Sequence, residues 1–179
     1  EYGDNGGSTF DRDPLSVPSR SDTVLVTSYT YDAVQAYTET TDPKGFVARV
    51  VVDEAGRTTS EVQNYSNGTP ANPDDNQTVK YEYVDGLRTK IIADMPSGES
   101  DQETLYIYGT TAGTPAAQVL STGDGLRGAK FPDSTNTGTT SANLNSDSSD
   151  VVSYAYNAQG QEVYRKDQAG SVYESDYDT

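Results

Sequence analysis

The sequence of 179 residues contains no cysteine, no histidine and no tryptophan. Without cysteine there is no disulfide framework, so the sequence neither requires nor excludes an oxidising compartment. Without histidine and cysteine, Ser-His-Asp and Cys-His catalytic arrangements are excluded, and so are the usual zinc sites. Any chemistry of this chain would have to use other side chains.

Positive charge is also scarce. Lys and Arg together number 12 against 28 Asp and Glu, which gives a net charge of −16. The basic residues are scattered without a cluster, so nucleic acid and anionic membrane surfaces are poor partners. No apolar run approaches the ~20 residues that a membrane-spanning helix needs. We therefore expect no nucleic-acid partner and no membrane span.

Large aliphatic residues are few, because Leu, Ile, Val and Phe together supply 29 of the 179 residues. With this net charge, such a content is typical of disordered chains. However, the chain has 14 Tyr, and its apolar residues are gathered in short segments. These features favour a folded chain with a thin hydrophobic core.

What the sequence does contain is a repeated motif, in which Asp or Asn is followed three residues later by Gly. Asp42 follows Tyr31-Asp32 by 10 residues and Asp53 follows Asp42 by 11; the same two spacings separate Asn157, Asp167 and Asp178. Asp or Asn at the first position and Gly at the last are typical of tight turns. The motif predicts hairpin turns at residues 42–45, 53–56, 94–98, 157–160 and 167–170.

A second motif is Tyr-x-Tyr, which occurs four times, at Tyr29/Tyr31, Tyr81/Tyr83, Tyr106/Tyr108 and Tyr154/Tyr156. Residues two apart point to the same face of a strand. The segments between turns are about seven residues long and rich in Val, Tyr and Thr, which is enough for strands of ~20 Å. We predict an all-β fold of consecutive β-hairpins in a spiralling antiparallel sheet. Adjacent hairpins are expected to cover Tyr29, Tyr31, Tyr81, Tyr83, Tyr154 and Tyr156.

The organisation that follows has four parts. Residues 1–20 form an irregular lead-in, and residues 21–120 carry hairpin repeats with a loop insertion at 64–78. Residues 121–150 are a polar, low-complexity insertion loop, and 151–179 carry repeats again. We expect the chain to be a fragment of a longer protein, with repeats continuing beyond it.

The repeat resembles the YD repeat of the Rhs family. The resemblance covers about two thirds of the chain and rests on Tyr29-Thr-Tyr31-Asp32, Asp42-Pro-Lys-Gly45, Asp53-Glu-Ala-Gly56-Arg57, Tyr154-Ala-Tyr156-Asn157-Ala-Gln-Gly160, Asp167-Gln-Ala-Gly170 and Tyr177-Asp178. It departs from the family pattern where Asp32-Ala-Val-Gln lacks the Gly and where Asn157 replaces Asp. The resemblance implies hairpins stacked into a hollow shell, which encloses a toxic C-terminal domain in bacterial polymorphic toxins. A related barrel occurs in teneurins.

Two motifs suggest ligands and are weighed against turns and loops. Gly123-Asp-Gly125-Leu-Arg-Gly128 matches a dinucleotide-binding pattern, but no helix can follow it, so we predict a turn. The acids at 73–76 and 145–150 make calcium the one cofactor to consider, although neither segment has EF-hand spacing. We expect solvated acidic loops there. Asn67 and Asn76 begin glycosylation sequons.

The leading hypothesis is a non-enzymatic structural segment of a secreted or surface-exposed Rhs/YD-repeat protein, building the wall of a β-shell. Its partners would be other repeats of the same longer chain or neighbouring subunits. The alternative is an adhesin or fibre-forming module that binds glycans or neighbouring subunits; an enzyme using loop carboxylates is a weaker third. No catalytic, cofactor-binding or metal residue is predicted. The residues with a predicted structural role in the repeat are Tyr29, Tyr31, Asp42, Gly45, Asp53, Gly56, Tyr81, Tyr83, Tyr106, Tyr108, Tyr154, Tyr156, Gly160, Asp167, Gly170 and Tyr177.

Overall fold

The computed structural model describes residues 19, 21, 24–67, 72–96, 98–109, 125–132 and 150–178. Eleven strands lie in these ranges: β1 (Ser28–Asp32), β2 (Tyr37–Thr41), β3 (Val47–Val52), β4 (Thr58–Gln63), β5 (Gln77–Val84), β6 (Leu87–Ala93), β7 (Gln102–Tyr108), β8 (Leu126–Lys130), β9 (Val151–Tyr156), β10 (Glu162–Lys166) and β11 (Val172–Glu174).

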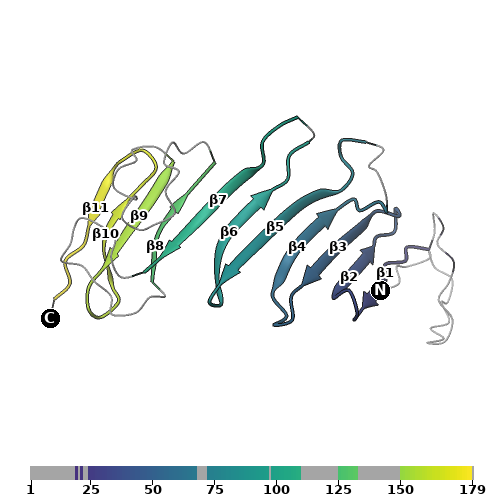
Figure 1. The fold of residues 1–179 in the computed structure, drawn as a ribbon, viewed down its shortest axis with the longest axis horizontal. Helices are drawn as coiled ribbons and strands as arrows, with labels where there is room; N and C mark the ends of the chain where they lie inside the picture. The colour runs from purple at the N-terminus through teal and green to yellow at the C-terminus, as the bar shows by residue number, and fades with distance from the viewer. Residues whose placement is uncertain are drawn as a thin grey trace. The chain divides into compact units, whose positions relative to one another are not determined.

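The strands form one open antiparallel sheet, in which each strand is hydrogen-bonded to its neighbours in the sequence (Figure 1). None of the described residues is helical. The prediction of an all-β chain of consecutive hairpins is therefore confirmed. Within the same residues, no helix is long and apolar enough to cross a membrane.

The chain divides into two compact units, which are described separately. Unit 1 comprises residues 1–80 and 94–98, and unit 2 comprises residues 81–93 and 99–179. Unit 1 holds β1 to β4 and the first half of β5, and unit 2 holds the remaining strands.

Unit 1 is a regular ladder joined by short turns. The β1–β2 pair places Tyr29 opposite Thr40 and Tyr31 opposite Thr38. β2 and β3 pair without interruption, and the register between β3 and β4 shifts between Val51 and Val52. Such a bulge adds one residue to one strand and increases the local twist.

Unit 2 contains the tightest turn among the described residues. Asp85 and Gly86 join β5 to β6 and have φ angles of 50° and 85°. Two consecutive positive φ angles are typical of the type I′ turn, for which Asp-Gly is a favoured sequence.

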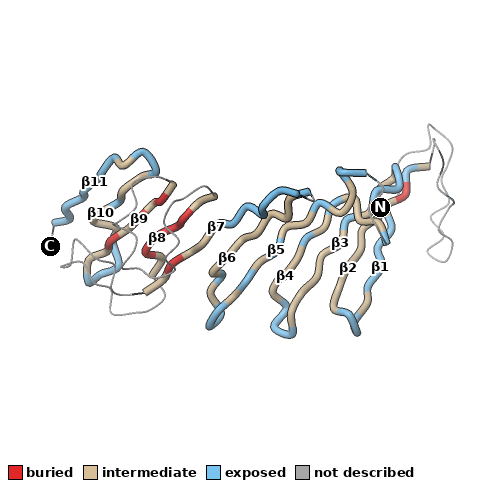
Figure 2. Tube along the Cα trace, turned by 45° about the horizontal axis from the view of Figure 1, so that its top comes forward, coloured by how far each residue is buried: buried red, intermediate tan, exposed pale blue. Residues whose placement is uncertain are grey.

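Burial differs between the two units (Figure 2). Among the described residues of unit 1, Val26 is the one buried residue. In unit 2 the buried hydrophobic residues gather on β7, β8 and β9, and three buried polar residues lie with them (Figure 2). The hydrophobic ones are Ile107, Ala129, Val151 and Ala155, and the polar ones are Arg127, Lys130 and Ser153. The expectation of a thin core holds for the described residues.

Two predicted loops can be compared with the strands. β4 ends at Gln63 and β5 begins at Gln77, so the described residues 64–67 and 72–76 of the predicted insertion at 64–78 lie between strands, and residues 68–71 lie outside the described ranges. The predicted loop at 121–150 is wrong for Leu126–Lys130, which forms β8, and the turn predicted at 123–128 is wrong for the same reason. The sequence of β8 has little β-propensity of its own. It becomes a strand because β7 and β9 pair with its two edges.

Candidate functional site

Four of the predicted turns share one set of backbone hydrogen bonds. In each, the first residue donates its N–H to the carbonyl of the residue four positions on, and the glycine donates its N–H to the carbonyl of the first residue. All eight distances lie between 2.9 and 3.0 Å. The turns begin at Asp42, Asp53, Asn157 and Asp167. This is a three-residue hairpin loop with a glycine bulge, and it confirms four of the predicted turns.

The glycines of these turns have positive φ angles, as expected. The values are 95° at Gly45, 78° at Gly56, 82° at Gly160 and 82° at Gly170. Backbones in this region disfavour residues that carry a Cβ, so the motif requires glycine here.

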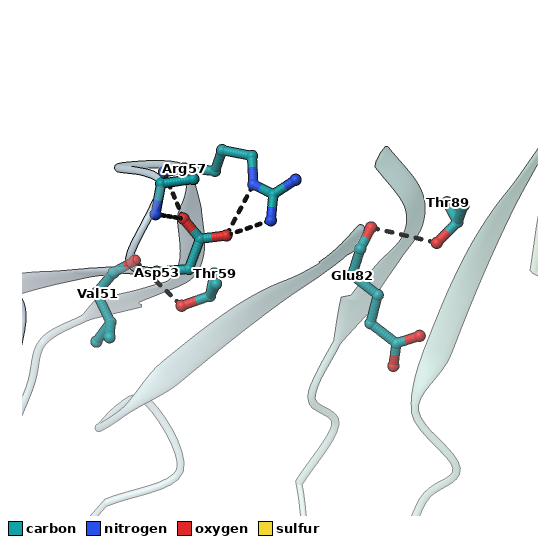
Figure 3. A network of polar contacts seen from close by, with 7 residues as sticks. Val51, Asp53, Arg57, Thr59, Glu82 and Thr89 are labelled. Atoms are coloured by element: carbon teal, nitrogen blue, oxygen red, sulfur yellow. Dashed lines mark hydrogen bonds and ion pairs between the residues drawn. The ribbon is translucent and has the colours of Figure 1, made fainter. Parts of the chain in front are cut away.

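The acids of the turns bind backbone amides. Asp53 Oδ1 accepts from the N–H groups of Ala55 and Arg57, both at 2.9 Å (Figure 3). Asp42 Oδ1 accepts from Phe46 N–H at 2.8 Å, and Asp167 Oδ1 from Ser171 N–H at 2.8 Å. For Asp53 one partner lies two residues later, and the partner shared by all three acids lies four residues later, because the turn brings the residue after the glycine back beside the acid.

These contacts lower the pKa of two turn acids. The Arg57 guanidinium, which donates from Nε to Asp53 Oδ2 at 2.7 Å, contributes most to holding the pKa of Asp53 below its ordinary value of 3.8. For Asp167 the largest cause is the Ser171 N–H, and again the pKa is lowered. These hydrogen bonds favour the ionised form of each carboxylate, and this is why both pKa values are lowered.

The first two turn acids do not converge on one point. Asp42 precedes β3 and Asp53 follows it, so the length of a six-residue strand, ~20 Å, separates them. Among the described residues there is no group of three or more Asp or Glu that could hold a metal ion. The geometry of Asp42 and Asp53 is that of turn formers.

The described residues at the two ends of the β4–β5 connection bond to one another, and we call this set of contacts the clasp. Asn76 donates its backbone N–H to the Asn64 carbonyl at 3.1 Å, and Asn64 Nδ2 donates to Asp75 Oδ1 at 2.7 Å. Asn76 Oδ1 accepts from Ser66 N–H at 2.7 Å. Of the sequon asparagines, Asn67 is exposed and Asn76 is half-buried in this clasp. In the other acidic segment Asp150 is described, whereas residues 145–149 lie outside the described ranges.

The Tyr-x-Tyr residues differ more than predicted. Tyr29 and Tyr31 are 53% and 73% exposed, so the expectation that they are covered is wrong. The tyrosines of the other three pairs are half-buried, and Tyr154 and Tyr156 stack with ring centroids 6.5 Å apart. The difference arises because β1 has β2 as its one strand partner among the described residues, whereas β5, β7 and β9 lie between two strands.

Sequence reasoning missed the contacts between arginine and tyrosine. The Arg49 guanidinium lies 4.1 Å from the centre of the Tyr37 ring and 3.6 Å from that of Tyr65, and its Nε donates to Glu39 Oε1 at 2.9 Å. Three more arginines lie over tyrosine rings, within 6.0 Å of the ring centres: Arg88 over Tyr81 and Tyr106, Arg127 over Tyr156, and Arg165 over Tyr173. Such contacts are favourable cation–π interactions. The sequence carried one signal of these contacts, because Arg88 and Arg127 each end a Gly-Leu-Arg segment.

Tyrosine hydroxyls and threonines add bonds across the strands. Tyr108 Oη donates to the Arg88 carbonyl and Tyr156 Oη to the Leu126 carbonyl, both at 3.0 Å. Tyr177 Oη donates to the Glu162 carbonyl at 2.9 Å. In unit 1 Thr59 donates to the Val51 carbonyl, and in unit 2 Thr89 donates to the Glu82 carbonyl (Figure 3). These side chains thus join β3 to β4, β5 to β6, β6 to β7 and β8 to β9, and they join Tyr177 to β10.

No protein-family model matches this sequence, and no curated protein matches it. The relation to YD repeats therefore stays a prediction based on the motif.

Proposed function

We propose that this chain is a non-enzymatic structural repeat segment of a secreted or surface-exposed YD-repeat protein, and that it builds part of the wall of a β-shell. The observation that carries the proposal is the turn geometry. Four turns, in both units, use the same backbone bonds, the same side-chain bond and the same positive-φ glycine. A function that depends on repeating one hairpin explains why the same turn recurs along the chain.

The thin core supports a role in a larger array. Within the described residues, five hydrophobic side chains are buried, and most strand residues are half-buried. Repeat proteins reach stability by stacking units, since one unit cannot bury its own surface. The cross-strand arginine–tyrosine contacts provide such stacking between neighbouring strands.

The chemistry of the chain supports a non-enzymatic role. It has no histidine or cysteine, and the acids of its turns are engaged with backbone amides. A wall segment requires surfaces that neighbours can cover, and it requires no nucleophile.

The test is a cryo-electron microscopy structure of the natural polypeptide that carries these residues. We expect a hollow particle in which β1 to β11 form part of the wall. A solid particle, or a filament in which both faces of the sheet contact solvent, would overturn the proposal.

The alternative, a glycan-binding adhesin module, is favoured by the exposed Tyr29, Tyr31 and Tyr173, because aromatic rings on open surfaces stack on sugars. A glycan array with the 179-residue chain tests it. If the double variant Tyr29→Ala/Tyr31→Ala loses glycan binding and the control Tyr177→Ala keeps it, the adhesin function would be favoured over the wall segment.

A further inference from the structure

The outer edge of β1 differs from every other Tyr-x-Tyr strand of the described chain. Ser28, Tyr29, Thr30 and Tyr31 are all exposed, and β2 is the single strand partner of β1 among the described residues. The edge carries no lysine, proline or bulge, which are the usual devices that prevent two edges from pairing. No described strand pairs with this edge.

The hydrogen bonds of β2 determine which residues of β1 face that edge. Asp42 donates to the Phe46 carbonyl and Val52 to the Ala36 carbonyl, so the even-numbered residues of β2 bond to β3. Odd-numbered residues of β2 therefore bond to β1, where their partners are Ser28, Thr30 and Asp32. The N–H and C=O groups of Tyr29 and Tyr31 consequently point to the open edge.

We propose that β1 pairs antiparallel with β1 of a second copy, about a twofold axis that passes beside Thr30. In this register Tyr29 lies opposite Tyr31 of the second copy, and Tyr31 opposite its Tyr29. These are the residues whose backbone groups point outward, so both pairs are of the hydrogen-bonded type. Thr30 lies opposite its own copy in a non-hydrogen-bonded pair.

The side chains of β1 fit this register. All four tyrosines of the dimer lie on one face, where facing aromatic residues on neighbouring strands stabilise a sheet. Asp32 lies opposite Ser28 of the second copy, so no acid faces an acid. Twofold dimers with self-complementary surfaces are the commonest assemblies.

The other end strand serves as a contrast. β11 is also exposed and has β10 as its single described partner. However, Glu174 ends β11, and Asp176 and Asp178 follow it at alternate positions, so pairing two such edges brings acids together. We infer that a second copy binds at β1 and not at β11, independently of whether the chain builds a shell.

The absence of cysteine from the sequence allows a direct test of the register. In Thr30→Cys the two thiols of the dimer would face each other across the axis. In the control Ser28→Cys, on the same exposed strand, they would be ~13 Å apart, because four residues of strand separate them. Under mild oxidation we expect Thr30→Cys to form a disulfide-linked dimer at least tenfold faster than Ser28→Cys. Equal rates would overturn the proposed register.

Charge exchange at Thr30 tests the dimer without cross-linking. By sedimentation we expect the unchanged chain to associate to a dimer as concentration rises. Thr30→Asp alone and Thr30→Lys alone should each weaken association at least tenfold, because like charges then face each other. A mixture of the two should restore a heterodimer, which also shows that both variants fold. A monomer at all concentrations, or a dimer that Thr30→Asp leaves unchanged and Glu174→Lys alters, would overturn the proposal.

Discussion

The β2–β4 ladder of unit 1 and the β7–β9 region of unit 2 are built from the same kind of strand, yet they are stabilised differently. In the first, regular turns connect strands whose residues are mostly half-buried. In the second, the connections are longer, and Ile107, Val151 and Ala155 are almost inaccessible to solvent. The repeated motif therefore specifies where the chain turns. It does not specify where side chains become buried, which depends on what lies over the strands.

The largest expected effect distinguishes these two regions directly. Ile107 is 4% exposed and clusters with Val151, so Ile107→Ala should lower the free energy of unfolding by about 3 kcal/mol through lost burial and a cavity. Val62→Ala in half-buried β4 should cost about 1 kcal/mol. Urea unfolding followed by circular dichroism measures both. Similar losses for the two variants would remove the distinction between the regions.

Glycine substitutions in the turns should affect both units alike. Gly56→Ala in unit 1 and Gly170→Ala in unit 2 should each cost about 1 kcal/mol, because both residues have positive φ. A Cβ at Gly56 would meet no atom within 4 Å, so the cost there would be purely conformational. The exposed neighbour Ala55, changed to Ser, is the control and should leave the unfolding midpoint unchanged. A cost in one unit alone would mean that the turns are not equivalent.

Replacing arginine by lysine should have a smaller effect. Arg49→Lys loses the planar guanidinium that lies against Tyr37 and Tyr65, and we expect a cost of about 0.5–1 kcal/mol. Arg88→Lys in unit 2 should cost less, because its ring distances are 5.8 and 5.4 Å. Thermal unfolding of the two variants compares them. A larger loss from Arg88→Lys would show that distance to the rings does not control this contribution.

The smallest effect concerns pH. The pKa of Asp53 is lowered in the folded state, so the unfolded state binds more protons as pH falls through the ordinary value of 3.8. The contribution of Asp53 is complete above that pH and is lost below it. Asp53→Asn should keep the turn, because Asn157 already forms the same turn with its Oδ1. The dependence of the unfolding midpoint on pH between about 6 and 2 should be weaker in Asp53→Asn than in the unchanged chain.

The sequence predicted the features that depend on local chemistry. Asp42, Asp53 and Asp167 form turns because their side chains bind nearby amides and the glycines accept positive φ, and both requirements are visible in the residues themselves. The exposure of Tyr29 and Tyr31 could not be predicted, because it depends on which strand lies at the edge. β8 was missed because its pairing with β7 and β9 outweighs its weak propensity. The turn at residues 33–36 was missed because Ala36, with φ of 52°, stands where a glycine is usual.

The clasp between Asn64 and Asn76 has a consequence for how such a chain can change. Its bonds join Asn64 and Ser66 to Asp75 and Asn76 at the base of the β4–β5 connection. Because the base fixes the register of β4 and β5, added residues at that point would not shift the strands. The entropy of closing a loop grows only slowly with its length, so long additions would cost little stability. The clasp thus marks a place where a recognition peptide or a whole domain can be inserted, by evolution or by design, while the sheet beneath it keeps its pairing.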